Sequence, residues 1–292
     1  MLIKQRCRKT DKNNTDKEKL GDVMATRRAN ILILCKTYPS PSKRYAETSC
    51  VAGMEETGRL IRLYPVPFRF LTEEQKFRKW QWINARIEKT RDDHRPESHR
   101  IYVDDLERQE PLSTRQGWLE RRQAIQSIPI FSSFDDLERA RVEQDISLGL
   151  LRPKKLVELE INPTKEKDWT QEELDKLMQL QKQGELFQET RSSVRVLQKI
   201  PFDFHYHYEC ETPAGAQIYK NKIVDWEVCA LYRKLTAQHG PQGWQAPFRD
   251  MLMRQLGETD LLFLMGNMHR HRHQWLIVSL IYPPKERQQA LF

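Results

Sequence analysis

Three carboxylates in the last third of the chain form the first group that could do chemistry. Asp225 and Glu227 open an expected helix, and Glu209 lies on an expected strand before it. Carboxylates hold Mg²⁺ beside the scissile phosphate in nucleases, and in base-excising enzymes they activate water or stabilise an oxocarbenium ion. We therefore name Asp225, Glu227 and Glu209 as candidate catalytic residues. The competing interpretation, which we favour, is that Asp225 caps the helix and the other acids are solvated.

Five histidines form the second group. They are His205, His207, His269, His271 and His273. The first two share a face of an expected strand with Glu209, and the other three alternate in an expected hairpin loop. If the strands that carry them are neighbours, their side chains could converge on zinc or a similar divalent metal, the one cofactor that the sequence suggests. The alternative is a solvated strand face and a basic loop.

Basic side chains form the third group. The candidate nucleic-acid-binding residues are Lys36, Lys43, Arg44, Arg62, Arg270 and Arg272. The first four lie among Tyr and Phe residues near the start of the chain, and the last two alternate with the histidines of the loop. Small β-barrels bind single strands by stacking bases on aromatic rings while Lys and Arg follow the phosphates. We expect this mode of contact here.

The elements that must position the basic group are short strands. Apolar or alternating segments at Ile31–Cys35, Arg59–Tyr64 and Trp80–Ile87 are separated by turns that contain Gly and Pro. Short strands joined in this way predict a small barrel.

The motifs inside this region resemble those of a known family. The order of an apolar strand, Cys50-Val-Ala-Gly53, Leu60-Ile-Arg62 and Arg95-Pro-Glu-Ser98 is similar to the first half of the dual-OB domain of bacterial conflict systems. That family has a Cys-x-Ala-Gly element, a Trp-Ile-Arg-Pro-like strand and a Gln-Pro-Glu-Asn-like end. Here the proline is displaced to Pro65, and Ser98 stands in place of Asn. The likeness covers about a third of the chain and implies an OB fold, nucleic-acid binding and a role in defence against phage.

The rest of the chain predicts helices and further strands. Residues from about Ser113 to Val142 are an expected helical insertion. Strict alternation over Lys199–Cys210 predicts a strand with one apolar face. Two helices, beginning at Asp225 and Gln245, and two apolar strands near Leu261 and Gln274 complete the pattern.

These elements predict an α+β fold, with an N-terminal OB-like β-barrel region and a C-terminal α/β region of strands and two helices. We place a flexible basic tail at residues 1–29 and an OB-like β-rich domain with its helical insertion at residues 30–165. A charged helical linker follows at residues 166–198, and the C-terminal α/β domain occupies residues 199–292. The likeness to dual-OB domains does not extend to this last domain.

Charge is unevenly distributed along the chain. The net charge is +8, but residues 1–29 carry nine Lys or Arg against four Asp or Glu, which leaves only +3 for the other residues. Nucleic-acid binding by the folded part must therefore rest on local patches. There is no close Cys pair, no membrane-length apolar run and no signal-peptide core, so the expected compartment is the cytoplasm.

The leading hypothesis from the sequence is a bacterial nucleic-acid-binding protein. We expect DNA as its partner in preference to RNA, and we expect no association with a membrane. The alternative is an enzyme on nucleic acid, either a glycosylase that removes modified bases or a metal-dependent nuclease. A third possibility is a protein–protein adaptor whose basic tail alone touches nucleic acid.

Overall fold

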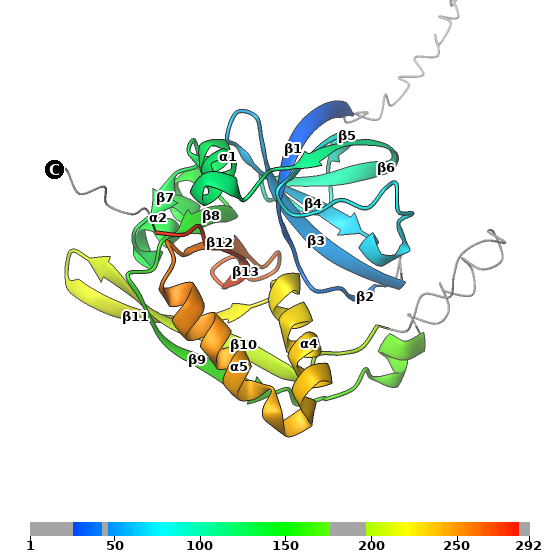
Figure 1. The fold of residues 1–292 in the computed structure, drawn as a ribbon. Coiled ribbons are helices and arrows are strands. Elements are labelled where there is room, and N and C mark those ends of the chain that lie inside the picture. Colours follow the sequence, from blue (N-terminus) through cyan, green and yellow to red (C-terminus); the bar gives the residue numbers. More distant parts are fainter. Residues whose placement is uncertain (1–25, 43–45, 176–196, 286–292) are drawn as a thin grey trace, which may run out of the picture.

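A closed barrel occupies the first part of the computed structural model, which describes residues 26–42, 46–175 and 197–285. Its strands are β1 (Arg27–Lys36), β3 (Ala46–Glu55), β4 (Leu60–Val66), β5 (Gln81–Lys89) and β6 (Ser98–Pro111), with the short β2 (Ser40–Ser42) beside β3. They pair in the order β1-β5-β6-β4-β3, and β3 returns to β1 to close the ring (Figure 1). The β4–β6 pairing is parallel. This is the Greek-key order of an OB-type barrel, which confirms the predicted N-terminal barrel.

Gly53 allows the barrel to close. It pairs with Ile33 of β1 on one side and with Ile61 of β4 on the other. A Cβ atom at this position would lie 2.4 Å from the carbonyl oxygen of Leu32. The last residue of the Cys-Val-Ala-Gly motif is therefore required by the close approach of two backbones.

A second sheet of seven strands follows the barrel. The new strands are β7 (Ile130–Phe131), β8 (Leu148–Leu151), β9 (Lys155–Pro163), β10 (Phe202–Thr212), β11 (Gly215–Ile223), β12 (Leu262–Asn267) and β13 (Trp275–Ile281). Their order is β7-β8-β12-β13-β11-β10-β9. The strands β8 and β9, from the range 30–165 that we expected to form the OB-like domain, pair within this second sheet. The mixture of barrel, sheet and helices confirms the predicted α+β class.

Helical segments accompany the two sheets. In the first half of the chain they are η1 (Phe68–Phe70), α1 (Arg115–Ile125) and α2 (Phe134–Gln144). The second half has α4 (Trp226–Gly243) and α5 (Gln245–Arg249), which continues as a π-helical turn, η2 (Asp250–Gln255). The expected helical insertion is thus two helices, with β7 between them. No helix among these described segments is long and apolar enough to cross a membrane.

Two helix starts are capped by side chains, and one of these is Asp225, the cap that the sequence suggested. The Ser133 hydroxyl accepts the N–H of Asp136 at the start of α2, and Asp225 accepts the N–H of Glu227 at the start of α4. These bonds satisfy N–H groups that a first helical turn leaves without a partner.

The apolar runs are buried on both faces. In β1, Ile31 and Ile33 point into the barrel, whereas Leu32 and Leu34 belong to a second cluster that includes residues of β8, β12 and β13. The strand β12 is also buried on both faces. Leu264 packs in the cluster shared with the barrel, whereas Phe263 and Met265 pack in the core under α4 and α5. The outer surface of the barrel and the second sheet therefore share one hydrophobic core.

A buried polar contact joins the two sheets inside this interface. Arg62 is only 4% exposed, and its Nη2 donates to the carbonyl oxygen of Ser147 at 3.0 Å. The N–H and hydroxyl of Ser147 donate to the carboxylate of Glu97 at 2.7 and 2.6 Å. The Arg95-Pro-Glu-Ser98 motif and Arg62 thus meet on Ser147, the residue before β8 of the second sheet.

Candidate nucleic-acid interface

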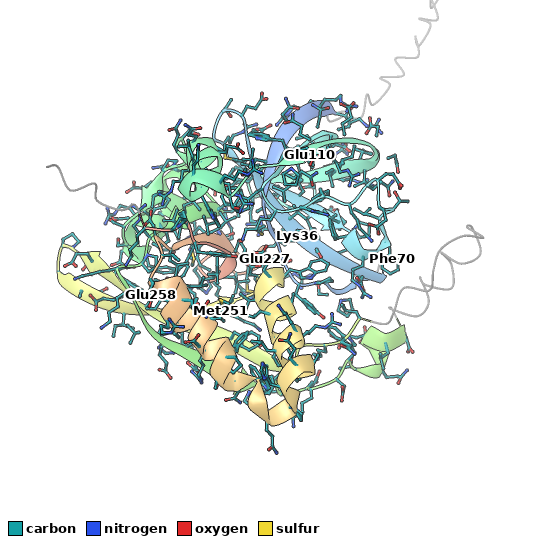
Figure 2. All side chains as sticks on the ribbon, in the orientation of Figure 1. Lys36, Phe70, Glu110, Glu227, Met251 and Glu258 are labelled. Carbon is teal, nitrogen blue, oxygen red and sulfur yellow. The ribbon has the colours of Figure 1, made fainter. Side chains whose placement is uncertain are left out.

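A cavity of about 390 Å³ lies where the barrel meets the start of α4, and we call it the junction pocket. Figure 2 labels Lys36 and Glu227 in this region, one on the barrel and one at the upper end of α4. Four cations, four aromatic rings, two carboxylates and an alanine line it. They are Lys36, Arg78, Lys79, Trp80, Trp118, Arg121, Asp225, Trp226, Glu227, Ala230 and Tyr282.

Lys36 enters the pocket from the end of β1. Its Nζ lies 3.9 Å from the centre of the Phe68 ring and donates to the carbonyl oxygen of Phe77 at 3.2 Å. Burial lowers the pKa of Lys36 to about 8, although the nearby Glu227 opposes the shift. The side chain is therefore mostly protonated at pH 7 and loses its charge in mildly alkaline solution.

Lys79 and the acids of α4 form a buried ionic group. The Nζ of Lys79 donates to Glu227 Oε2 at 2.9 Å and to the carbonyl oxygen of Leu280 at 2.8 Å. Asp225 is 2% exposed; its Oδ1 accepts the N–H of Glu227 and its Oδ2 the N–H of Leu280. This bears out the helix-cap interpretation of Asp225. Glu227, by contrast, keeps an exposed carboxylate at the rim.

Burial and charge act in opposite directions on this group. Burial alone would lower the pKa of Lys79, but Asp225 and Glu227 raise it above its ordinary value. Burial raises the pKa of Asp225, and Lys79 limits that rise. The ammonium group of Lys79 thus favours the charged form of Asp225 and opposes the effect of burial on its pKa.

The aromatic wall is held in a constrained backbone. The rings of Trp80 and Trp118 lie 5.7 Å apart, the Tyr282 ring is 5.4 Å from that of Trp118, and the Arg121 guanidinium lies 4.6 Å from the Trp118 ring centre. Trp80 and Trp118 have φ values of 65° and 68°, a left-handed conformation that bulky residues seldom adopt. Such conformations gather at ligand-binding sites, where the surrounding structure enforces them.

An apolar recess adjoins the junction pocket. It has a volume of about 220 Å³ and shares Asp225, Glu227 and Tyr282 with the pocket. Its remaining walls come from α4, from the helical segment after α5 and from β13. They are Val228, Leu231, Met251, Leu252, Leu256 and Leu280. The pocket and the recess are thus adjacent and share three lining residues, and the cations line only the pocket.

Two family models divide the chain where the structure divides it. A model described as a domain of unknown function, DUF8757, matches residues 130–292, which is more than half of the chain. The chain belongs to this family. A second domain of unknown function, DUF8758, matches residues 27–127. The two matches meet between α1 and β7, where the barrel region ends and the second sheet begins.

Comparisons with individual proteins identify no relative of known function. No curated protein matches the chain. A solved structure of a replication protein A heterotrimer bound to single-stranded DNA aligns with 89% of this chain at 9% identity and a TM-score of 0.24. This chain spans 65% of the length of that one. A TM-score of 0.24 does not establish a shared fold.

The basic residues that we predicted from the sequence are dispersed. Lys36 lines the junction pocket, whereas Arg62 is buried under the second sheet. Arg272 pairs with Asp145 at 2.5 Å, and Arg270 is exposed on the hairpin loop between β12 and β13. Lys43 and Arg44 lie outside the described residues.

The three candidate catalytic acids do not converge. Asp225 and Glu227 line the junction pocket, but Glu209 lies on β10, where it pairs with Lys154 at 3.3 Å. In the part of the chain that the structure describes, no group of three or more His, Cys, Asp or Glu side chains could hold a metal ion. The arrangement expected for a two-carboxylate nuclease centre with Glu209 is therefore not present among these residues.

The histidines are separated by an intervening strand. His205 and His207 lie on β10, whereas the other three, His269, His271 and His273, lie in the β12–β13 hairpin loop. The strand β11 pairs with β10 on one side and with β13 on the other. His207 instead contacts Glu160 of β9 at 2.5 Å, and His269 lies 3.0 Å from Asp93. The condition for a shared zinc site, that the two carrying strands be neighbours, is not met.

Sequence reasoning missed most of the pocket. Lys79, Trp80, Trp118, Arg121 and Tyr282 come from three distant segments. The one local signal was the Arg78-Lys79-Trp80 run, which places cations beside an aromatic ring before β5. No spacing rule connects that run to Trp118 or Tyr282.

Proposed function

We propose that the protein binds single-stranded nucleic acid, with DNA the expected partner, and that the strand crosses the junction pocket. The observation that supports this most directly is the lining of the pocket, where four cations and four aromatic rings outnumber two carboxylates. Cations attract phosphates, and exposed rings offer stacking surfaces to unpaired bases.

The usual binding face of an OB barrel is not available here. That face lies on the second and third barrel strands, which in this chain are β3 and β4. Their outward side chains Ala52, Met54 and Leu60 pack in the cluster shared with β8, β12 and β13. The loop between β5 and β6 is also occupied, because Arg95 donates to the carbonyl oxygen of Asn267 at 2.6 Å. The junction pocket is a cationic, aromatic surface that remains beside the barrel.

The test is a binding titration with labelled single-stranded oligonucleotides at several salt concentrations. Each phosphate contact in a single strand contributes about 0.7 to the slope of log affinity against log salt. The double variant Arg78→Gln/Arg121→Gln should reduce this slope by about 1.4 and weaken binding of every sequence. The matched control is Arg59→Gln/Arg139→Gln, which removes two exposed cations far from the pocket. Equal losses in the two double variants would refute the proposal.

A base-excising activity is the second candidate, and the rim carboxylate of Glu227 favours it over a metal-dependent nuclease. A carboxylate beside a bound base can activate water or stabilise an oxocarbenium ion without a metal. Incubation with modified DNA followed by alkali distinguishes the outcomes. Breaks that appear only after alkali indicate base excision, breaks that require Mg²⁺ indicate a nuclease, and intact DNA leaves a binding protein.

The likeness to dual-OB domains extends the proposal to defence against phage. The measurement is the plating efficiency of a phage panel on bacteria with and without the chain. The variant Arg78→Gln/Arg121→Gln should lose protection together with binding. Protection that survives the loss of binding would separate the two roles.

A further inference from the structure

The apolar recess is set apart from the junction pocket by its chemistry. None of the four pocket cations lines it, and its walls are aliphatic side chains together with Met251, Tyr282 and the two acids of α4. Figure 2 labels Met251 on the helical segment after α5, beside α4 and near Glu227. An anionic group therefore belongs in the pocket, and a flat or apolar group belongs in the recess.

The recess is formed partly by an irregular helix. Met251, Leu252 and their neighbours lie on the π-helical turn η2. Turns of this kind are rare and occur frequently at functional sites. Methionine adapts its shape to different partners and makes favourable contacts with aromatic rings. The wall formed by Met251 is thus suited to an aromatic occupant.

Glu227 supplies a hydrogen-bond acceptor at the boundary between the two halves. Its Oε2 accepts from Lys79 at 2.9 Å. Within the part of the chain that the structure describes, its Oε1 has no hydrogen-bond partner, and about half of the side chain is exposed. Both oxygens of Asp225 accept backbone N–H groups. Glu227 is therefore the carboxylate that can accept from an exocyclic amino group of a base.

We propose that the apolar recess receives one unstacked nucleobase while the phosphates beside it stay on the cations of the junction pocket. The proposal rests on the proposed function, since the strand must first lie across the pocket. Three observations support it: the recess adjoins the pocket and shares three of its lining residues, the cations line only the pocket, and Glu227 offers an acceptor where the two meet. The expected occupant is a base with an exocyclic amino group, which means adenine, cytosine or guanine in preference to thymine or uracil.

The test uses a single strand in which one adenine is replaced by 2-aminopurine, whose fluorescence is quenched by stacking. Binding to the wild-type protein should raise the fluorescence by about threefold or more as the base leaves its neighbours. Met251→Trp fills the recess and should abolish the rise, while the salt slope of binding, which depends on the cations of the junction pocket, should be retained. Leu231→Trp fills it from α4 and serves as the second variant. Met268→Trp, on the exposed hairpin loop, is the matched control and should behave like the wild type.

Each failure has a distinct signature. If the wild type binds strands in a salt-sensitive manner without a rise in fluorescence, the recess proposal is overturned and the binding function stands. If the wild type binds no strand, both fail. A rise that persists in both recess variants would place the base elsewhere. A change in oligomeric state in Met251→Trp, measured by light scattering, would assign the recess to a second copy of the chain and overturn the proposal.

Discussion

The ammonium nitrogen of Lys79 lies 2.9 Å from the Oε2 atom of Glu227, and this contact joins the segment before β5 to the first turn of α4. Lys79 also donates to the carbonyl oxygen of Leu280, the same residue whose N–H donates to Asp225. One lysine therefore links the barrel, a helix start and β13 at the base of the junction pocket. The shape of the pocket depends on this link.

Replacement of Lys79 by Met should destabilise the protein by about 3–5 kcal/mol at pH 7, because it leaves Asp225 buried and uncompensated. Burial already raises the pKa of Asp225. When the pKa of a carboxyl is higher in the folded than in the unfolded protein, the group stabilises the fold at low pH. This contribution is lost as the pH rises from the unfolded-state pKa to the folded-state pKa. The loss in Lys79→Met should therefore be smaller at pH 4 than at pH 7, as measured by urea unfolding at both.

The matched variant is Lys79→Met/Asp225→Asn, in which no charge is left at the base of the pocket. It should recover part of the loss at pH 7, because no charge is buried, although the amide oxygen can accept only one of the two backbone N–H groups that Asp225 satisfies. Equal unfolding energies for the single and double variants would show that Asp225 is not the residue that Lys79 compensates.

Lys36 should make binding depend on pH in the alkaline range. Burial lowers its pKa to about 8, so the protonated form is present below that pH and is lost above it. Affinity for a single strand should fall as the pH rises through about 8. In Lys36→Arg the guanidinium keeps its charge, and the fall should disappear. An identical pH profile in the two proteins, from fluorescence anisotropy, would assign the effect to another group.

Trp118 should contribute to binding by stacking. Its ring is half-buried and faces the pocket between Arg121 and Tyr282. Trp118→Ala should weaken the affinity for a single strand by about 1–3 kcal/mol, and Trp118→Phe should recover part of this. The neighbouring exposed Leu119→Ala is the control and should bind normally. Because Trp118 also packs against Trp80, unfolding curves must be measured alongside the titrations. If Trp118→Ala lowers the affinity and Trp118→Phe restores none of it, the result would argue against stacking.

Arg62 should affect stability and leave the salt dependence of binding unchanged. It is buried and donates to Ser147 across the interface. Arg62→Ala removes a charged donor to a buried carbonyl and should cost about 2–3 kcal/mol in urea unfolding. The control Arg59→Ala breaks an ion pair whose arginine is well exposed, and should cost less than about 1 kcal/mol. If Arg62→Ala instead lowered the salt slope of a fully stable protein, the residue would be a phosphate contact after all.

Local patterns in the sequence predicted the elements that depend on neighbours along the chain. Alternation over residues 199–210 predicted a strand, and β10 indeed buries Phe204, Tyr206 and Tyr208 on one face. Asp225 predicted a helix start, because an N-cap bonds an N–H only two or three residues away. Short strands separated by Gly and Pro turns predicted the barrel, and the structure shows why Gly53 stands where two strands approach closely.

Only the tertiary structure decided which of these elements meet. The sequence specified that Ile31–Cys35 is an apolar strand, but not that Leu32 and Leu34 face a second sheet, which buries Arg62 with them. It could not show that β11 separates the two groups of histidines, because strand order is set by packing between distant segments. For the same reason, the junction pocket, built from residues as far apart as Lys36 and Tyr282, has no signature along the chain. Helix capping and hydrophobic periodicity act over a few residues. The burial that assembles a pocket acts between surfaces that are far apart in the sequence.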